Sequence, residues 1–282
     1  SMAKDLPGFV VLTSLGQGGQ NQPIAARQWS SGFLPSKYQG VQLRGKGDPV
    51  LYLANPKGVS RTQQEVDIQT INALNRQYNT VADDPEIATR IAQYELAFQM
   101  QASVPALMDI SQEKPETLEL YGCRPGDGSF ASNCLLARRL AEKGVRFIQL
   151  YHKDWDHHGG VGDGVRLKAE EIDRAQAALI KDLKQRDMLK DTIVVWGGEF
   201  GRTPKMGTDN GGNITGRDGR DHWAGCFFAV FAGGGVQGGR TIGKSDKHGA
   251  YPAVNPYKPS DLGATVYSAL GIEPGAEVTD RN

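Results

Sequence analysis

The chain has 282 residues, and its 32 basic and 32 acidic side chains give a formal net charge of zero. A chain without excess positive charge has no global field that would attract nucleic acid or an anionic membrane. Its mean hydropathy is −0.45, and it has no apolar run of the roughly 18 residues that a membrane span needs. The three cysteines are too scattered for a disulfide framework or a cysteine-based zinc site. We expect a soluble globular chain with no nucleic-acid or membrane partner.

The N-terminal segment predicts a strand followed by irregular structure. Phe9–Thr13 (FVVLT) is an apolar run typical of a strand. The Gly/Gln-rich loop Ser14–Asn21 lacks the GKS/T ending of a phosphate-binding loop. Arg27–Pro56 carries aromatic residues among prolines and glycines, which we expect to pack on the core: Trp29, Phe33, Tyr38 and Tyr52. The alternative is that these aromatic side chains form an oligomer or substrate surface.

Two helices are predicted next. Ser60 opens a helical stretch to about Asn79, whose apolar stripe would consist of Val66, Ile68, Ile71 and Leu74. Asp84 is a typical N-cap, because the proline after it suits the first helical position, and this second helix should run to about Ser103. The spacing predicts a hairpin of two helices, inserted into the main sheet or laid over it.

A polar connector, Ser111–Gly128, is the best candidate boundary between an N-terminal part (residues 1–128) and a C-terminal α/β core (residues 129–282). Within it, Cys123-Arg-Pro-Gly-Asp resembles the start of the sulfatase signature, whose cysteine becomes formylglycine. Asp127 stands where that signature has arginine, and the segment does not follow an opening strand. We therefore do not expect Cys123 to be a nucleophile.

Strands and helices alternate in the C-terminal part. Val145–Leu150, Thr192–Trp196 and Cys226–Ala232 are short apolar runs that predict strands. Helical periodicity covers Asn133–Lys143, Ala169–Leu189 and Ser260–Leu270. This alternation predicts an α/β fold in which the three strands join a mostly parallel sheet with helices on both faces.

The stretch Tyr151–Gly160 (YHKDWDHHGG) follows the first of these C-terminal strands. It holds two aspartates and three of the chain's five histidines: Asp154, Asp156, His152, His157 and His158. Ligands bind at the carboxyl ends of strands in open α/β sheets. Imidazole and carboxylate at short spacing can supply several ligands to one divalent metal ion. A solvated polar loop is the alternative, and the density of histidine favours the metal site.

Two further polar clusters are expected at the same edge. Glu199 and Arg202 follow the second strand within GGEFGRTP, and Arg220, Asp221 and His222 precede the third. Each cluster alone could cap a helix or pair with surface charges. Together with the first stretch they supply imidazoles, carboxylates and guanidiniums beside glycine-rich backbone. This combination is typical of a hydrolase acting on hard anions, in which a metal ion acts as Lewis acid and arginines hold non-bridging oxygens.

The sequence resembles the bacterial family catalogued as domain of unknown function 1501, which is abundant in planctomycetes and related to the sulfatase and alkaline phosphatase superfamily. The resemblance spans nearly all of the chain. It is carried by FVVLTS (9–14), SGFLPSKYQGVQLR (31–44), DPVLYLANP (48–56), DPEIATRIAQYELAFQMQASVP (84–105), NCLLARRLAEKGVRFIQLYH (133–152), WDHH (155–158), WGGEFGRTP (196–204), GRDHW (219–223) and DLGATVYSALGI (261–272).

The resemblance implies a sulfatase-like core with a pair of divalent metal ions, which could be zinc, manganese or calcium. Asp156, His158 and His222 would form one site, and Glu199 would contribute to the second. Asp154 is an additional candidate ligand, since Asp154 and His158 also fit the Asp-x-x-x-His spacing of phosphatases. Arg202 and Arg220 are the candidate catalytic residues. The substrate would be a small phospho- or sulfoester, and an exported or periplasmic location is implied. The oligomeric state is left open.

Several departures from the family pattern lead us to expect a weak or inactive hydrolase. Family members carry an N-terminal part that holds the first strand, an aspartate ligand and the presumed hydroxyl nucleophile, so the chain is expected to be truncated. Its leading Ser-Met is typical of a tag-cleavage remnant, and we expect no signal peptide. Phe200 stands where the second metal site usually has histidine. The hydroxyl groups of Thr13 and Ser14 are candidate nucleophiles by position, but the strand that they follow has no catalytic role in the family, so we do not expect them to act as such. The alternative is a non-catalytic binding or surface-assembly protein that keeps the fold and at most one metal ion.

Overall fold

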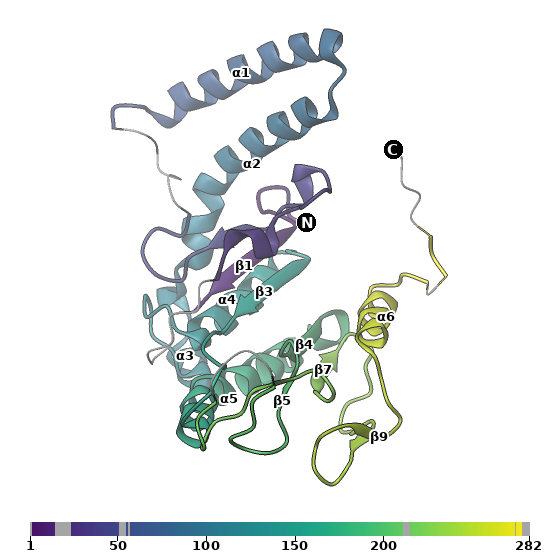
Figure 1. Cartoon of the computed structure of the whole chain (residues 1–282). Helices are drawn as coiled ribbons and strands as arrows, with labels where there is room; N and C mark the ends of the chain where they lie inside the picture. Colours follow the sequence, from purple (N-terminus) through teal and green to yellow (C-terminus); the bar gives the residue numbers. More distant parts are fainter. Residues whose placement is uncertain are drawn as a thin grey trace. The chain divides into compact units, whose positions relative to one another are not determined.

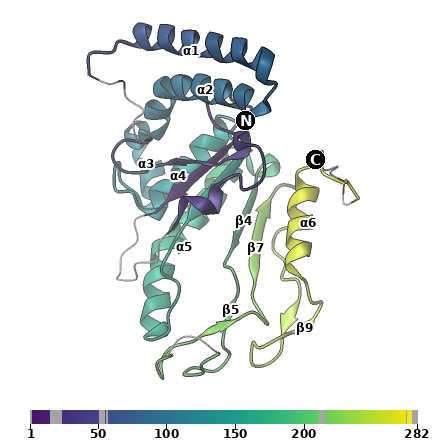
Figure 2. The ribbon, with the colours of Figure 1, turned by 45° about the horizontal axis from the view of Figure 1, so that its top comes forward.

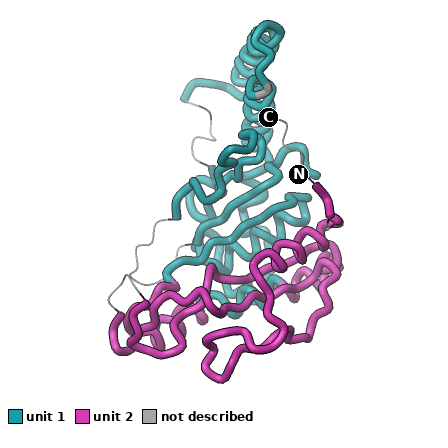
Figure 3. Tube along the Cα trace, turned by 45° about the vertical axis from the view of Figure 1, so that its right-hand side comes forward, with its two compact units in different colours: residues 1–154, 171–179 teal, residues 155–170, 180–282 magenta. Residues whose placement is uncertain are grey.

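A computed structural model describes residues 2–14, 24–50, 55, 57–210, 215–273 and 275–277. Within these residues the fold is mixed α/β, with six α-helices, one parallel sheet of three strands and smaller antiparallel ribbons. Contacts divide the chain into two compact units (Figure 3). Unit 1 comprises Ser1–Asp154 and Glu171–Leu179, and unit 2 comprises Trp155–Glu170 and Ile180–Asn282. The predicted boundary after residue 128 falls inside unit 1.

The sheet of unit 1 has the strand order β2-β1-β3, and both pairings are parallel. Its members are β1 (Phe9–Thr13), β2 (Val41–Leu43) and β3 (Phe147–Tyr151). The central strand β1 carries Val10, Val11 and Leu12, which are fully buried, as expected of a strand covered on both faces. The predicted strands at residues 9–13 and 145–150 are confirmed, the second with a start two residues later.

Helices α1 (Arg61–Ala82) and α2 (Pro85–Met108) form the predicted hairpin (Figure 1). The predicted caps are confirmed, because the Ser60 side chain accepts a hydrogen bond from the backbone N–H of Gln63 and Asp84 accepts one from that of Glu86. The apolar stripe predicted for α1 does not pack against the core. Its members Val66, Ile71 and Leu74 are exposed. The buried residue of α1 is instead Asn72, whose Nδ2 lies 3.2 Å from Oε1 of Glu95 on α2.

The polar connector contains a helix that the sequence analysis missed. Residues 115–121 form α3 (Pro115–Tyr121), which begins with proline and ends at Gly122 in the left-handed conformation (φ 73°). Proline at the start and glycine at the end are helix-end signals, which we had interpreted as loop signals. The next helix, α4 (Phe130–Glu142), confirms the prediction at residues 133–143 and packs against β1 and β3.

The aromatic segment packs on the core only in part. Trp29 is buried, whereas Phe33 is 98% exposed and Tyr38 is 55% exposed. Tyr52, and the predicted Gly/Gln loop beyond Ser14, lie outside the described residues. Short 3-10 turns complete this description: η1 (Ala26–Trp29), η2 (Ser36–Tyr38), η3 (Ile110–Gln112) and η4 (Leu189–Asp191).

Unit 2 contains an antiparallel pair, β4 (Ile193–Gly197) and β7 (Ala229–Gly233), with Val195 opposite Phe231 (Figure 2). The prediction of one mostly parallel sheet that includes these strands and β3 is therefore wrong, although each predicted strand forms. The physical reason lies in the connection. A parallel pairing needs a crossover, which is usually a helix, and the described residues between β4 and β7 contain no helix.

Smaller elements complete unit 2. β5 (Gly201–Arg202) pairs with β6 (His222–Trp223), and β8 (Lys244–Ser245) pairs with β9 (Pro252–Val254). The last helix is α6 (Pro259–Ala269). Helix α5 (Val161–Gln185) contributes residues to both units and begins earlier than the predicted Ala169. No described helix combines the length and apolar character needed to cross a membrane.

Candidate metal centre

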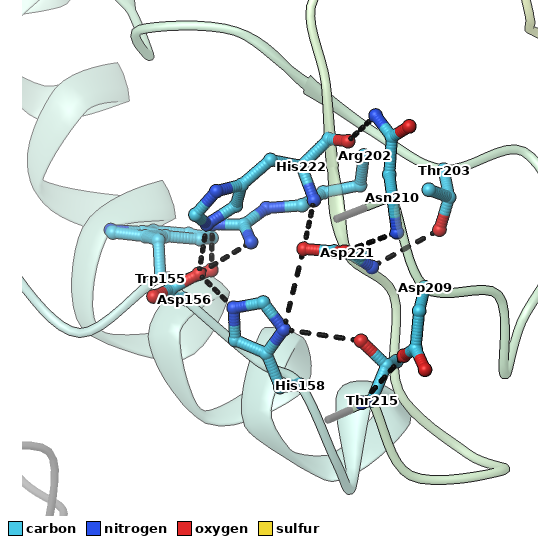
Figure 4. A network of polar contacts seen from close by, with 10 residues as sticks. All are labelled: Trp155, Asp156, His158, Arg202, Thr203, Asp209, Asn210, Thr215, Asp221 and His222. Carbon is cyan, nitrogen blue, oxygen red and sulfur yellow. Dashed lines mark hydrogen bonds and ion pairs between the residues drawn. The ribbon is translucent and has the colours of Figure 1, made fainter. Parts of the chain in front are cut away.

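Three ligand-type side chains of unit 2 converge on one point (Figure 4). Asp156, His158 and His222 each offer one ligand atom, and these atoms lie within 4.8 Å of one another. Oδ1 of Asp156 lies 3.0 Å from Nε2 of His158 and 2.9 Å from Nε2 of His222. The structure therefore brings together the residues that were predicted to form the first metal site.

Local chain geometry explains this convergence. Asp156 and His158 belong to the loop between β3 and α5, and His222 lies on β6. In the β5–β6 ribbon, Arg202 is directly opposite His222, so both side chains project from the same face. Gly201 permits this pairing, because a Cβ atom at that position would lie 1.9 Å from the carbonyl oxygen of Cys226. The glycine before Arg202 is thus required by packing.

Backbone contacts also fix the position of His158. Its carbonyl oxygen accepts a hydrogen bond of 2.7 Å from the N–H of Gly216. A Cβ atom on Gly219 would lie 1.9 Å from that same carbonyl oxygen, so only glycine allows the two backbone segments to approach so closely. The glycine-rich segment before His222 therefore holds the loop that carries His158.

Arg202 forms an ion pair with the aspartate. Its Nη1 donates a hydrogen bond of 2.5 Å to Oδ1 of Asp156. Burial opposes ionisation of Asp156, but the hydrogen bonds from Arg202 and His222 outweigh burial and lower the pKa of its carboxyl group to about 2. Asp156 therefore stays a carboxylate, the form that binds a metal ion, to a lower pH than an ordinary aspartate.

A second buried aspartate stands behind the histidines. Asp221 is 3% exposed, and its carboxylate accepts hydrogen bonds from the backbone N–H groups of Asn210 and His222. These two bonds lower the pKa of Asp221. The sequence predicts Asp221 as a member of the polar cluster with Arg220 and His222, but it does not point to Asn210 and Thr215, which lie in a Gly/Asn-rich loop. No spacing signal in the sequence identifies these contacts.

The other predicted site residues lie outside this group. Glu199 is exposed just after β4, and its role as ligand to a second ion stays a prediction. Asp154 is 2% exposed, has a positive φ of 69° and belongs to unit 1. Its role as an additional ligand also stays a prediction. Arg220 uses its Nε to donate a hydrogen bond of 2.6 Å to the carbonyl oxygen of Thr203, and its predicted catalytic role stays untested.

The remaining histidines of the YHKDWDHHGG stretch contact other residues. In unit 1, Nε2 of His152 lies 2.7 Å from Oε2 of Glu171, and the ring contacts Phe130 edge to face. The ring of His157 lies so close to Gly164 that a Cβ atom there would be 2.5 Å from it. Two of the three histidines that favoured a metal site are therefore outside the triad.

Cys123 does not have the properties of a reactive thiol. It is 6% exposed, and burial together with the charge of Asp127 raises its pKa to about 11. Because the thiolate is the nucleophile, a thiol with such a pKa is unreactive at neutral pH. This agrees with the expectation that Cys123 is not a nucleophile.

The triad fits a divalent metal ion by composition and by distance. Two imidazole nitrogens and one carboxylate oxygen are the protein ligands of a frequent type of catalytic zinc site. Bonds of about 2.0–2.1 Å in a tetrahedron place the ligand atoms about 3.3–3.4 Å apart. The two distances from Asp156 to the imidazoles, 2.9 and 3.0 Å, are a few tenths of an ångström shorter than this, and all three ligand atoms lie within 4.8 Å of one another. The residues that could hold a metal ion are thus Asp156, His158 and His222.

Comparison with known proteins gives the family. The family model described as "Protein of unknown function (DUF1501)" matches residues 1–282. The chain belongs to the DUF1501 family. Among curated proteins and solved structures, no match was found. The predicted membership in DUF1501 is confirmed, and the description of that family states no activity. Any function of this DUF1501 protein must therefore be argued from its side chains.

Proposed function

We propose that this DUF1501 protein is a weak metal-dependent hydrolase of small phospho- or sulfoesters, with a centre built on Asp156, His158 and His222. The observation that carries the proposal is the convergence of these three ligand atoms beside the guanidinium of Arg202. A divalent cation next to a guanidinium is an arrangement suited to binding a tetrahedral oxyanion. The resemblance of the sequence motifs to the sulfatase and alkaline phosphatase superfamily is in keeping with this substrate class.

The side chains have separable tasks in this proposal. Asp156 and the two histidines would hold the metal ion, which when bound supplies Lewis acidity toward the ester oxygens. Arg202 pairs with Asp156 and would donate hydrogen bonds to an anion bound beside it. Its Nη2 also lies 3.4 Å from the carbonyl oxygen of Trp155, which orients the guanidinium plane.

The same surroundings explain why we expect weak activity. Glu199 is exposed and outside the ligand group, so a second ion would be held by a single carboxylate facing water. The ring of Phe200 lies 5.0 Å from the ring of His222, where it adds an apolar surface and no ligand. Without a second cation, developing negative charge in the transition state is less stabilised, which costs several kcal/mol.

The test combines metal content with ester hydrolysis. The purified protein is assayed with p-nitrophenyl phosphate and p-nitrophenyl sulfate in the presence of zinc, manganese or calcium. We expect one metal ion per chain and slow turnover, both lost in His158→Ala. The matched control is His248→Ala, because His248 is exposed and outside the ligand group. Turnover that survives in His158→Ala contradicts the proposal. So does a wild-type protein that binds no metal ion when the metal is in excess.

The second candidate is a non-catalytic binding protein with a single metal ion. Phe200 favours it, because it stands where the corresponding superfamily motif has a second imidazole and its ring lies beside that of His222. Two results distinguish the candidates. One bound metal ion with no turnover on either ester favours the binding protein. One ion with turnover that depends on both His158 and Arg202 favours the hydrolase, and Arg202→Met should then raise KM for the phosphate ester.

A further inference from the structure

Asp221 contacts both histidines of the triad without joining the ligand group (Figure 4). Its Oδ1 accepts a hydrogen bond of 2.7 Å from the backbone N–H of His222 and lies 3.6 Å from Nδ1 of His158. Its Oδ2 accepts a hydrogen bond of 2.5 Å from the N–H of Asn210. One carboxylate, buried to 3% exposure, thus links the ring of one histidine to the backbone of the other.

The two nitrogens of the His158 ring face different partners. Nε2 points to Oδ1 of Asp156 at 3.0 Å, which is the ligand position. Nδ1 points to Asp221 and lies 3.3 Å from Oγ1 of Thr215. A neutral imidazole that binds a metal ion through Nε2 must carry its proton on Nδ1. The negative charge of the Asp221 carboxylate, 3.6 Å from Nδ1, favours that tautomer.

The position of Asp221 is itself fixed. Its backbone N–H donates a hydrogen bond of 3.1 Å to Oγ1 of Thr203, and its carbonyl oxygen accepts one of 2.8 Å from the N–H of Thr203. Asn210 adds a further tie, because its Nδ2 donates a hydrogen bond of 2.8 Å to the carbonyl oxygen of His222. These hydrogen bonds tie Asp221, the residue before β6, to Thr203 and Asn210.

We propose that Asp221 is a positioning residue of the metal centre, which orients His158 through its ring and His222 through its backbone so that both Nε2 atoms face Asp156. This inference rests on the proposed metal site and adds a residue to it. It excludes Asp221 as a direct ligand of the same ion, because its carboxylate lies on the Nδ1 side of His158 and accepts backbone N–H groups. Outer partners of this kind change metal affinity by about 10–100-fold.

The test measures metal affinity rather than activity. Zinc binding is followed by competition with a chromophoric chelator, and the cobalt form is followed by its visible absorption spectrum. We expect Asp221→Asn to bind zinc about 10–100-fold more weakly than wild type and to shift the cobalt bands. The matched control is Asp246→Asn, because Asp246 also accepts backbone N–H groups, from His248 and Ala250, within the same unit. That variant should keep wild-type zinc affinity.

A second measurement needs no variant, so it decides the matter even if Asp221→Asn does not fold. In the zinc-loaded wild-type protein, ¹⁵N NMR of the imidazoles should show His158 protonated on Nδ1 and bound through Nε2. Coordination through Nδ1 overturns the inference, and so does unchanged zinc affinity in a folded Asp221→Asn variant. If the wild-type protein binds no metal ion, the proposed function fails first and this inference fails with it.

Discussion

Two networks of charged side chains, one in each unit, show how similar ingredients serve different purposes. In unit 1, Glu113 accepts from Arg139 through Oε1 at 2.6 Å and from Arg138 through Oε2 at 2.8 Å. Arg138 also binds Glu142 at 2.7 Å. In unit 2, a single oxygen of Asp156 is approached by Arg202 and by the two imidazoles of His158 and His222. The first network distributes its bonds, whereas the second concentrates them.

The difference lies in the balance of donors and acceptors. In unit 1, two guanidiniums meet two carboxylates, and each oxygen of Glu113 has its own donor. The two positive and two negative charges of this network balance, and the ion pairs stabilise the packing of α4. In unit 2, three nitrogen groups share one carboxylate oxygen, and the two imidazoles can also act as lone-pair donors. That surplus of ligand atoms is what a cation would use. The number of ion pairs alone would not have distinguished the two.

The largest expected effect on stability comes from Arg138→Ala in the first network. The Arg138 side chain is 2% exposed, and its removal leaves Glu113 buried with one partner fewer. Removing one member of a buried ion pair costs about 3–5 kcal/mol. We expect a loss of that size in the free energy of unfolding, measured by urea denaturation, with unchanged zinc affinity. The Arg202 side chain is 22% exposed. If Arg202→Ala lowered the free energy of unfolding as much as Arg138→Ala, the two networks would not differ in their contribution to stability.

Asp156→Ala should show the opposite pattern. Loss of a direct ligand should weaken zinc binding by more than the about 100-fold that outer partners reach. The pair that Asp156 forms with Arg202 is about a quarter exposed on both sides, and the lowering of the Asp156 pKa from 3.8 to about 2 corresponds to about 2 kcal/mol before solvent screening. Its removal should therefore lower the free energy of unfolding of the metal-free protein by about 1–2 kcal/mol, which is less than the loss in Arg138→Ala. Chelator competition and urea denaturation on the same sample measure both quantities. If Asp156→Ala strongly lowered the free energy of unfolding but left zinc affinity unchanged, Asp156 would not be a metal ligand.

Acid should act on the first network through Glu113. Burial opposes its ionisation, but the hydrogen bonds from Arg138 and Arg139 outweigh burial and lower its pKa from the ordinary value of 4.5. A carboxyl group with a lowered folded-state pKa adds stability above its unfolded pKa, and that contribution is lost as the pH falls through the folded value. Wild type should therefore exceed Glu113→Gln in stability at neutral pH, and this difference should shrink below pH 4.5. Urea denaturation at a series of pH values provides the measurement.

The sequence was sufficient where a local signal decides the outcome. The caps of α1 and α2 and the buried run of β1 follow from residue type and spacing. Residue type alone placed Asp156, His158 and His222 in polar clusters at one edge, and the family resemblance implied that these three form one site. Such features depend on neighbouring residues or on motifs that recur as a unit.

The rest depends on long-range packing that spacing does not encode. β4 and β7 are apolar runs that suit parallel or antiparallel pairing equally well, and their antiparallel partnership is set by the connection. The apolar residues Ile71 and Leu74 had helical spacing, yet α1 turns Asn72 toward α2. His152 looked like a ligand but pairs with Glu171, which lies on α5. In each case the partner is distant in sequence.

The smallest expected effect comes from Glu142→Gln, at the outer end of the first network. Glu142 is 32% exposed and pairs with Arg138 one helical turn away, and pairs at this spacing contribute about 0.3–0.5 kcal/mol. We expect a loss of that size in urea denaturation, well below the loss in Arg138→Ala, because Glu113 still compensates the buried guanidinium. The Arg138→Ala/Glu142→Gln double variant isolates the pair, and its loss should match that of Arg138→Ala. If Glu142→Gln alone lowered the free energy of unfolding by several kcal/mol, the exposed pair would contribute as much as the buried one. Burial would then not explain why Arg138 stabilises the protein.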